Sequence, residues 1–237
     1  MTIPYILALA CILMSLAVAT LRAFDHYRWG FAAKCVASTL FCLTAVAALG
    51  QRIAPTNGAA TRIFIGLALG MVGDVLLGLA PLLSKKMNFA CSGLGGAAFF
   101  VGHIFYIHAL LIGVAVHWPF LVLLPVIPLL FIVLYKTKTF DPGKRIIPIF
   151  GYGIVLGIMM VAALNYALNM ADGPLGNLPI ALLMWVPGIL FAISDTSLFL
   201  RGFGAKKLDR FAVHFDFAVM LPYFSAQAIF ALLVAYI

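Results

Sequence analysis

Eight apolar segments, each about as long as a helix that crosses a lipid bilayer, dominate this chain of 237 residues. A bilayer-spanning helix needs about 20 apolar residues. The segments lie at 3–20, 31–50, 62–83, 89–114, 118–135, 146–169, 178–200 and 211–235. Short loops separate them, and charged residues make up 9% of the chain, against about 25% in soluble domains. The sequence therefore predicts an all-α membrane protein, with residues 1–237 forming a single bundle of about eight transmembrane helices.

The fifth segment is the least regular of the eight. Pro119, Pro125 and Pro128 interrupt it, and a proline inside a helix removes a backbone hydrogen bond.

Basic residues are distributed very unevenly along the chain. Thirteen of the fifteen Lys and Arg residues fall in or beside the loops that follow the first, third, fifth and seventh spans, and only Arg52 and Arg62 fall on the other side. Cytoplasmic loops carry such an excess, so we expect both termini outside and the basic loops in the cytoplasm, most simply in the inner membrane of a bacterial cell. The same bias explains the net charge of +8 without a nucleic-acid partner, and no obligate protein partner is inferred.

All seven acidic residues are aspartates, and three of them, Asp74, Asp195 and Asp216, lie within or at the edge of apolar spans. A charged side chain at the centre of a bilayer helix costs roughly 2.5–3.5 kcal/mol and usually marks a functional site. Given the expected orientation, almost all the other strongly polar residues of the spans fall in the cytoplasmic half or near the midplane, among them Lys34, His103, Tyr152, Tyr223 and Gln227. This pattern predicts one shared polar cavity that opens towards the inner leaflet.

Helical spacing predicts which of these residues share a face. The four predicted faces are Gly66, Gly70, Asp74 and Gly78; Gly96, Phe99, His103 and Tyr106; Gly188, Phe191, Asp195 and Leu198; and Asp216, Met220, Tyr223 and Gln227. Small residues let a neighbouring backbone come close, which would shield Asp74 from lipid.

Structural roles are the alternative for several of these residues. The glycine stripe suits helix packing, His103 suits a bond between helices, and Lys34 has a stem long enough to snorkel to the interface. His108 and His117 suit interfacial positions, and His214 and Asp216 suit solvated ones. The four cysteines, Cys11, Cys35, Cys42 and Cys91, suit small core positions. A pair of membrane aspartates is harder to explain as structure, because few cations are present at that depth.

Four segments together resemble the YhhN family of lysoplasmalogenase-like membrane proteins. They read GDVLLGL, GLGGAAFFVGHIFYIHAL, GILFAISDTSLFL and YFSAQ. The family pattern falls on Gly73, Asp74, Phe99, Gly102, His103, Tyr106, Ser194, Asp195, Tyr223 and Gln227. One departure lies in the second span, where the family commonly has Lys-Pro and this chain has Lys34 followed by Cys35.

The resemblance implies an enzyme, a lysoplasmalogenase. Its substrate is a lysophospholipid with a vinyl-ether chain, and its products are a fatty aldehyde and glycerophosphocholine or glycerophosphoethanolamine. The reaction protonates the alkene carbon, and water then adds to the resulting oxocarbenium ion. Glycosidases meet a related transition state with two carboxyl groups in different protonation states.

These considerations give each residue an expected role. Asp74 and Asp195 form the catalytic pair, with Asp74 as the acid and Asp195 as its ionised partner, and His103 orients water or shuttles the proton. Substrate binding is expected from Lys34, Tyr106, Tyr152, Ser194, Tyr223 and Gln227, with Lys34 attracting the phosphate. No cofactor or metal is required by this scheme.

Other classes of function stay open at this point. His103, His214, Asp74, Asp195 and Asp216 include ligand types that zinc prefers, as in a metal-dependent membrane hydrolase. Membrane aspartates and histidines also form proton relays in transporters. A structural membrane protein without turnover would leave the aspartate pair unexplained.

Overall fold

A computed structural model describes residues 2–51, 58–172 and 178–236. These residues form helices joined by short turns, and no β-strand is found among them. The α-helices are α1 (Thr2–Ala23), α2 (Tyr27–Leu49), α3 (Ala59–Leu79), α4 (Lys85–Leu111), α5 (Trp118–Leu123), α6 (Val126–Lys136), α7 (Ile146–Asp172), α8 (Leu178–Phe203) and α9 (Ala212–Leu233). Three 3₁₀ turns, η1 (Ala80–Leu82), η2 (Gly143–Arg145) and η3 (Lys206–Phe211), lie between them.

Eight of the resulting spans are long and apolar enough to cross a membrane. The predicted all-α architecture with about eight transmembrane helices is therefore confirmed, and the chain is an integral membrane protein. The predicted boundaries shift by a few residues; the fourth helix, for example, begins at Lys85 rather than at 89. Arg52, which was counted in the charge distribution, lies outside the described residues.

The fifth span is broken, as its prolines predict. Helix α5 ends at Leu123 and α6 begins at Val126, because Pro125 has no N–H to continue the ladder of helical hydrogen bonds. This span packs chiefly against α7 and leaves most of its apolar side chains exposed, as expected for a helix that faces lipid.

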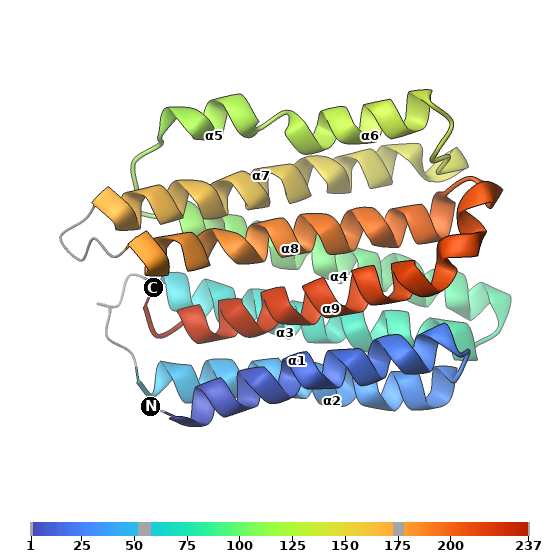
Figure 1. Cartoon of the computed structure of the whole chain (residues 1–237), viewed down its shortest axis with the longest axis horizontal. Coiled ribbons are helices and arrows are strands. Elements are labelled where there is room, and N and C mark those ends of the chain that lie inside the picture. Colours follow the sequence, from blue (N-terminus) through green and yellow to red (C-terminus); the bar gives the residue numbers. More distant parts are fainter. Residues whose placement is uncertain (1, 52–57, 173–177, 237) are drawn as a thin grey trace.

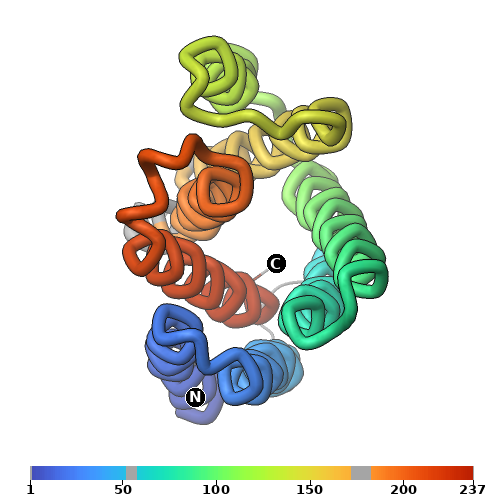
Figure 2. The backbone as a smooth tube through the Cα atoms, turned by 90° about the vertical axis from the view of Figure 1, so that its right-hand side faces the viewer, coloured from blue at the N-terminus to red at the C-terminus, as the bar shows by residue number. Residues whose placement is uncertain are grey.

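The other seven spans form a ring in the order α1, α2, α3, α4, α7, α8 and α9, which closes between α9 and α1 (Figure 2). Helix α9 also contacts α2 and α3, and it is the most buried span. Both termini lie at one end of the bundle (Figure 1). The turns 24–26, 80–84, 137–145 and 204–211 lie at the other end, which we call the basic end because the predicted basic loops meet there.

Glycines of α3 make room for side chains from neighbouring helices. A Cβ at Gly66 would collide with the Tyr106 ring, and one at Gly70 would lie 2.5 Å from the Gln227 amide nitrogen. Close backbone approach, which the sequence suggested, occurs where Gly102 meets the Gly66 carbonyl oxygen. Also on α4, Gly95 packs against Leu77, whereas a Cβ at the expected Gly96 would have no neighbour within 4 Å.

Candidate active site

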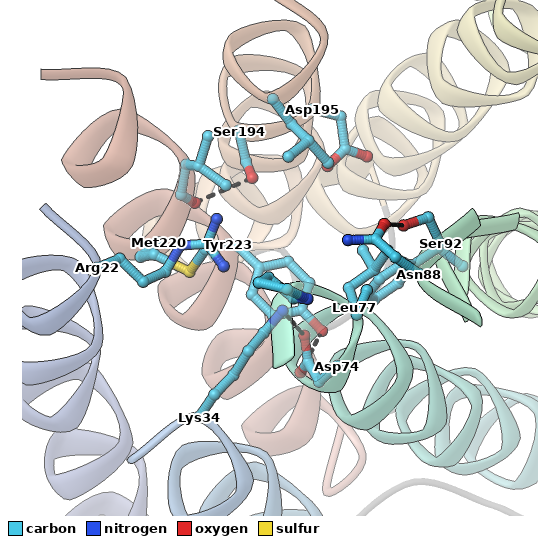
Figure 3. Close-up of a pocket in the computed structure, with 15 residues that line it drawn as sticks. Arg22, Lys34, Asp74, Leu77, Asn88, Ser92, Ser194, Asp195, Met220 and Tyr223 are labelled. Carbon is cyan, nitrogen blue, oxygen red and sulfur yellow. Dashed lines mark hydrogen bonds and ion pairs between the residues drawn. The ribbon is translucent and has the colours of Figure 1, made fainter. Parts of the chain in front are cut away.

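A cavity of about 220 Å³ opens at the basic end of the bundle, with charged and polar side chains set in a mainly apolar lining. Helices α1, α2, α3, α4, α8 and α9 all contribute to its wall, which includes Arg22, Lys34, Asp74, Asn88, Asp195 and Tyr223. Asp74 and Asp195 lie on opposite sides of it (Figure 3). The structure therefore brings the two predicted aspartates to one cavity.

Asp74 is held by one cation and two hydroxyl donors, which come from two neighbouring helices. The Lys34 ammonium lies 3.0 Å from Asp74 Oδ1. The hydroxyl groups of Ser38 and Tyr223 donate hydrogen bonds to Oδ2 over 2.6 Å and 2.8 Å. A carboxylate with a cationic partner and two hydroxyl donors has the contacts that a buried charge requires.

A chain of hydrogen bonds extends from Asp74 into the bundle. Tyr106 donates to Gln227 Oε1 over 2.6 Å, and Gln227 Nε2 donates to the Tyr223 hydroxyl over 2.9 Å. The Tyr223 hydroxyl accepts a hydrogen bond from Gln227 and donates its own proton to Asp74. The chain therefore fixes the direction in which this hydroxyl, which lines the cavity, donates.

Asp195 has a different set of neighbours. Tyr152 donates to its Oδ2 over 2.8 Å, and His103 Nε2 lies 3.7 Å from the same oxygen. The other ring nitrogen of His103 lies 2.7 Å from the Phe99 carbonyl oxygen. A carbonyl only accepts hydrogen bonds, so Nδ1 carries a proton. Nε2 is the nitrogen that faces Asp195, and it has no hydrogen-bond partner among the described residues.

The ring of Phe191 lies between the cluster around Asp74 and the cluster around Asp195, which are the two aspartate clusters of the site. Phe191 lies 5.0 Å from the His103 ring and 5.9 Å from the Tyr223 ring, measured between centroids. Its side chain is fully buried, so it sets the spacing of the two clusters from the apolar side.

Several predicted substrate-binding residues lie behind the cavity wall. None of His103, Tyr106, Tyr152 and Gln227 lines the cavity; Tyr152 is partly buried and the other three are buried. Their polar contacts connect them to the cavity wall through Asp195, Phe99 or Tyr223. Ser194 does reach the wall, but its hydroxyl donates to the Val219 carbonyl oxygen over 3.0 Å. Ser194 therefore joins α8 to α9.

The position of Lys34 differs from the expectation. Its side chain does not snorkel to the interface, because the residue is only 4% exposed and its ammonium pairs with Asp74. A cation was therefore present at the depth where few were expected. The Lys34 ammonium, which was expected to attract the phosphate, is already paired with the Asp74 carboxylate.

Asp216 also differs from the expectation of a solvated residue. It is buried, and its Oδ1 lies 3.7 Å from Arg22 Nε and 3.9 Å from Arg201 Nε. His214, by contrast, is exposed as expected.

Two residues of the site escaped the sequence analysis. Ser38 lies four residues after Lys34, on the same face of α2, and that spacing was the available signal. Arg22 was counted only as a loop charge, although it lies in the last turn of α1 and lines the cavity.

The residues considered as zinc ligands do not form a metal site in the described part of the chain. In residues 2–51, 58–172 and 178–236, no group of three or more His, Cys, Asp or Glu side chains is close enough to hold a metal ion. Asp74, Asp195 and Asp216 instead have separate partners.

Comparison with known proteins identifies one relationship. No curated protein and no solved structure gives a significant match. A family model matches residues 27–234, which include α2 to α9 and every residue of both aspartate clusters. The chain therefore belongs to the YhhN family.

Proposed function

We propose that this protein is a lysoplasmalogenase, which hydrolyses the vinyl-ether bond of a lysophospholipid. The observation that carries the proposal is the pair of buried carboxyl groups on opposite sides of one cavity, with different partners. Membership of the YhhN family supports the choice of substrate, because lysoplasmalogen hydrolysis is the activity that the resemblance implies.

The contacts of the two aspartates favour roles opposite to those expected from the sequence, which made Asp74 the acid and Asp195 its ionised partner. Asp74, with Lys34 and two hydroxyl donors, is suited to remain a carboxylate. Asp195, beside His103 Nε2, is suited to hold a proton that the two side chains exchange. Asp195 is thus the proposed acid and Asp74 the proposed base.

The reaction then follows from these positions. Asp195 donates its proton to the second carbon of the vinyl group, and an oxocarbenium ion forms at the carbon that bears the ether oxygen. The Asp74 carboxylate stabilises this cation and removes a proton from the attacking water. The resulting hemiacetal then collapses to a fatty aldehyde and the glycerophospho-alcohol. Asp74 gives the proton it took from water to the leaving ether oxygen, and the hydroxyl proton of the hemiacetal passes to the pair of Asp195 and His103, which restores both groups.

The remaining residues position these groups. Tyr152 orients Asp195, and the chain from Tyr106 through Gln227 to Tyr223 orients Asp74. Lys34 compensates the charge of Asp74 before it takes the proton from water, which keeps the carboxylate available in a site of low polarity.

Release of fatty aldehyde from an alkenyl-lysophospholipid by the purified protein tests the proposal. A lysophospholipid with a saturated ether is the substrate control, because it lacks the carbon that accepts the proton. We expect Asp195→Asn to lower turnover by about 10²–10⁴-fold, the usual contribution of a general acid. Asp209→Asn, the same change at an exposed residue of η3, is expected to leave turnover unchanged.

Two results would contradict the proposal. The first is the absence of aldehyde from folded wild-type protein, after which ion flux in proteoliposomes would test the transporter alternative. The second is near-normal turnover by both Asp195→Asn and Asp74→Asn.

A further inference from the structure

The mouth of the cavity carries positive charge that the proposed reaction does not use. We propose that Arg22 and Asn88 form a binding site for the phosphodiester of the lipid headgroup, with Asp216 as the residue that positions Arg22. This inference rests on the proposed function, since it names the part of the substrate that the mouth recognises.

Arg22 places its guanidinium group at the cavity. Its stem lies against α2, where a Cβ at Gly30 would be 3.5 Å from Arg22 Cγ. The Nε atom is buried and has no hydrogen-bond partner among the described residues. Figure 3 shows the guanidinium group pointing into the cavity. A buried donor that lacks a partner costs free energy, and an anionic ligand would remove that cost.

The neighbouring charges leave Arg22 able to bind an anion. Asp216 is shared between Arg22 and Arg201 at distances of 3.7 Å and 3.9 Å, both longer than a charge-assisted hydrogen bond. Two guanidinium groups thus share one carboxylate. Asp25 lies in the exposed turn after α1 and accepts a hydrogen bond from the Tyr27 hydroxyl.

Asn88 supplies a second donor from the opposite wall. Ser92 donates to Asn88 Oδ1 over 3.2 Å, which assigns the carbonyl oxygen of the amide to Ser92 and leaves the NH₂ group for the cavity. Figure 3 shows the amide nitrogen directed inward, facing the side of the cavity from which Arg22 enters.

The depth of these residues matches the order of groups in the lipid. Arg22 ends α1 and Asn88 lies in the first turn of α4, both at the basic end. Lys34 lies well after the start of α2 at Tyr27, and Asp74 lies before the end of α3 at Leu79. Both are therefore further from the basic end, towards the middle of the bundle. In a lysophospholipid the glycerol carbons separate the phosphate from the vinyl ether. A phosphate at the mouth therefore places the vinyl ether deeper, beside the aspartates.

Lys34 does not compete for this role. Its ammonium is already paired with Asp74, and a phosphate there would displace the cation that stabilises the proposed base. Arginine is also better suited than lysine to a phosphodiester, because its planar donors bind two oxygens at once.

Binding of lipids that the enzyme does not cleave tests the inference separately from the reaction. The full chain in maltoside micelles is titrated with a saturated-ether lysophosphocholine and with the alkylglycerol of the same chain length, which lacks the phosphate. We expect Arg22→Gln to weaken binding of the lysophosphocholine about 10- to 100-fold, the range for a lost hydrogen bond to a charged group. Binding of the alkylglycerol is expected to stay the same.

Arg28→Gln is the matched control, because Arg28 is an exposed arginine in the first turn of α2 at the same end of the bundle. It is expected to leave both affinities unchanged. Competition distinguishes the two sources of phosphate. Glycerophosphocholine is expected to displace the lysophosphocholine at lower concentration than inorganic phosphate does.

Each alternative result overturns the inference. Unchanged lysophosphocholine binding by Arg22→Gln would remove Arg22 from the site, and equal loss of both lipids would make its role structural. Stronger competition by inorganic phosphate would indicate a site for free phosphate. If Arg22-dependent binding is found but no aldehyde is formed from a vinyl-ether lipid, the proposed function fails and the binding site stands.

Discussion

At the scale of single residues, the ion pair between Lys34 and Asp74 decides how the site works. Both side chains are almost completely buried, and they lie 3.0 Å apart. Each charge is tolerable in the bundle only because the other is present, since an unpaired buried charge is very costly. The pair therefore serves stability and the proposed chemistry together.

Replacement of Lys34 tests this dependence. Lys34→Met leaves Asp74 without its cation, and we expect a loss of about 3–5 kcal/mol in unfolding free energy, as for other broken buried pairs. The double variant Lys34→Met/Asp74→Asn has no buried charge at this site and should recover part of the loss. Thermal unfolding in micelles measures both variants, and losses that simply add would contradict the coupling.

At the scale of helices, hydropathy and helical spacing predict much of the fold and part of the site. Length and composition fix the eight spans, and the spacing of Asp216, Met220, Tyr223 and Gln227 places them on one buried face of α9. Spacing within a helix does not say which neighbour that face meets. For this reason the sequence analysis assigned Lys34 to the phosphate, and Tyr106 and Gln227 to the substrate. In the structure Lys34 pairs with Asp74, and Tyr106 and Gln227 bind each other one layer behind the cavity wall.

The glycines of α3 give a second prediction at this scale. Gly66→Ala introduces a Cβ into the Tyr106 ring, and overpacking of this kind typically costs about 1–3 kcal/mol. Displacement of Tyr106 also breaks its hydrogen bond to Gln227, so turnover should fall as well.

Gly93→Ala is the control for this change. Gly93 is an exposed residue of α4 with no neighbour within 4 Å, and alanine is the better helix former. Thermal unfolding should show equal or slightly higher stability. A Gly66→Ala protein as stable and as active as Gly93→Ala would contradict the packing of α3 against Tyr106.

At the scale of the whole molecule, the charge distribution and the cavity mark the same end. The turns of the basic end lie at the opposite end of the bundle from both termini. The cavity opens at this basic end, beside Arg22, Pro81 and Asn88. If the basic loops are cytoplasmic, as their charge predicts, the lipid headgroup enters from the inner leaflet.

Labelling of single cysteines on intact bacterial cells tests this orientation. In a background without Cys11, Cys35, Cys42 and Cys91, a cysteine is placed at Lys207 in η3 or at Trp118 at the start of α5. Both residues are exposed and lie at opposite ends of the bundle. We expect a membrane-impermeant maleimide to label Trp118→Cys and to label Lys207→Cys only after lysis. Labelling of Lys207→Cys on intact cells would reverse the orientation.

The central proposal is that Asp195 delivers a proton to a vinyl carbon inside this cavity. Hydrolysis of an alkenyl-lysophospholipid in D₂O tests it most directly, with the aldehyde reduced at once to the alcohol and analysed by mass spectrometry. Wild-type protein should yield aldehyde with one deuterium at carbon 2, and Asp195→Asn should yield almost none. No aldehyde from folded wild-type protein, or aldehyde without deuterium at carbon 2, would contradict protonation of the vinyl ether by this site.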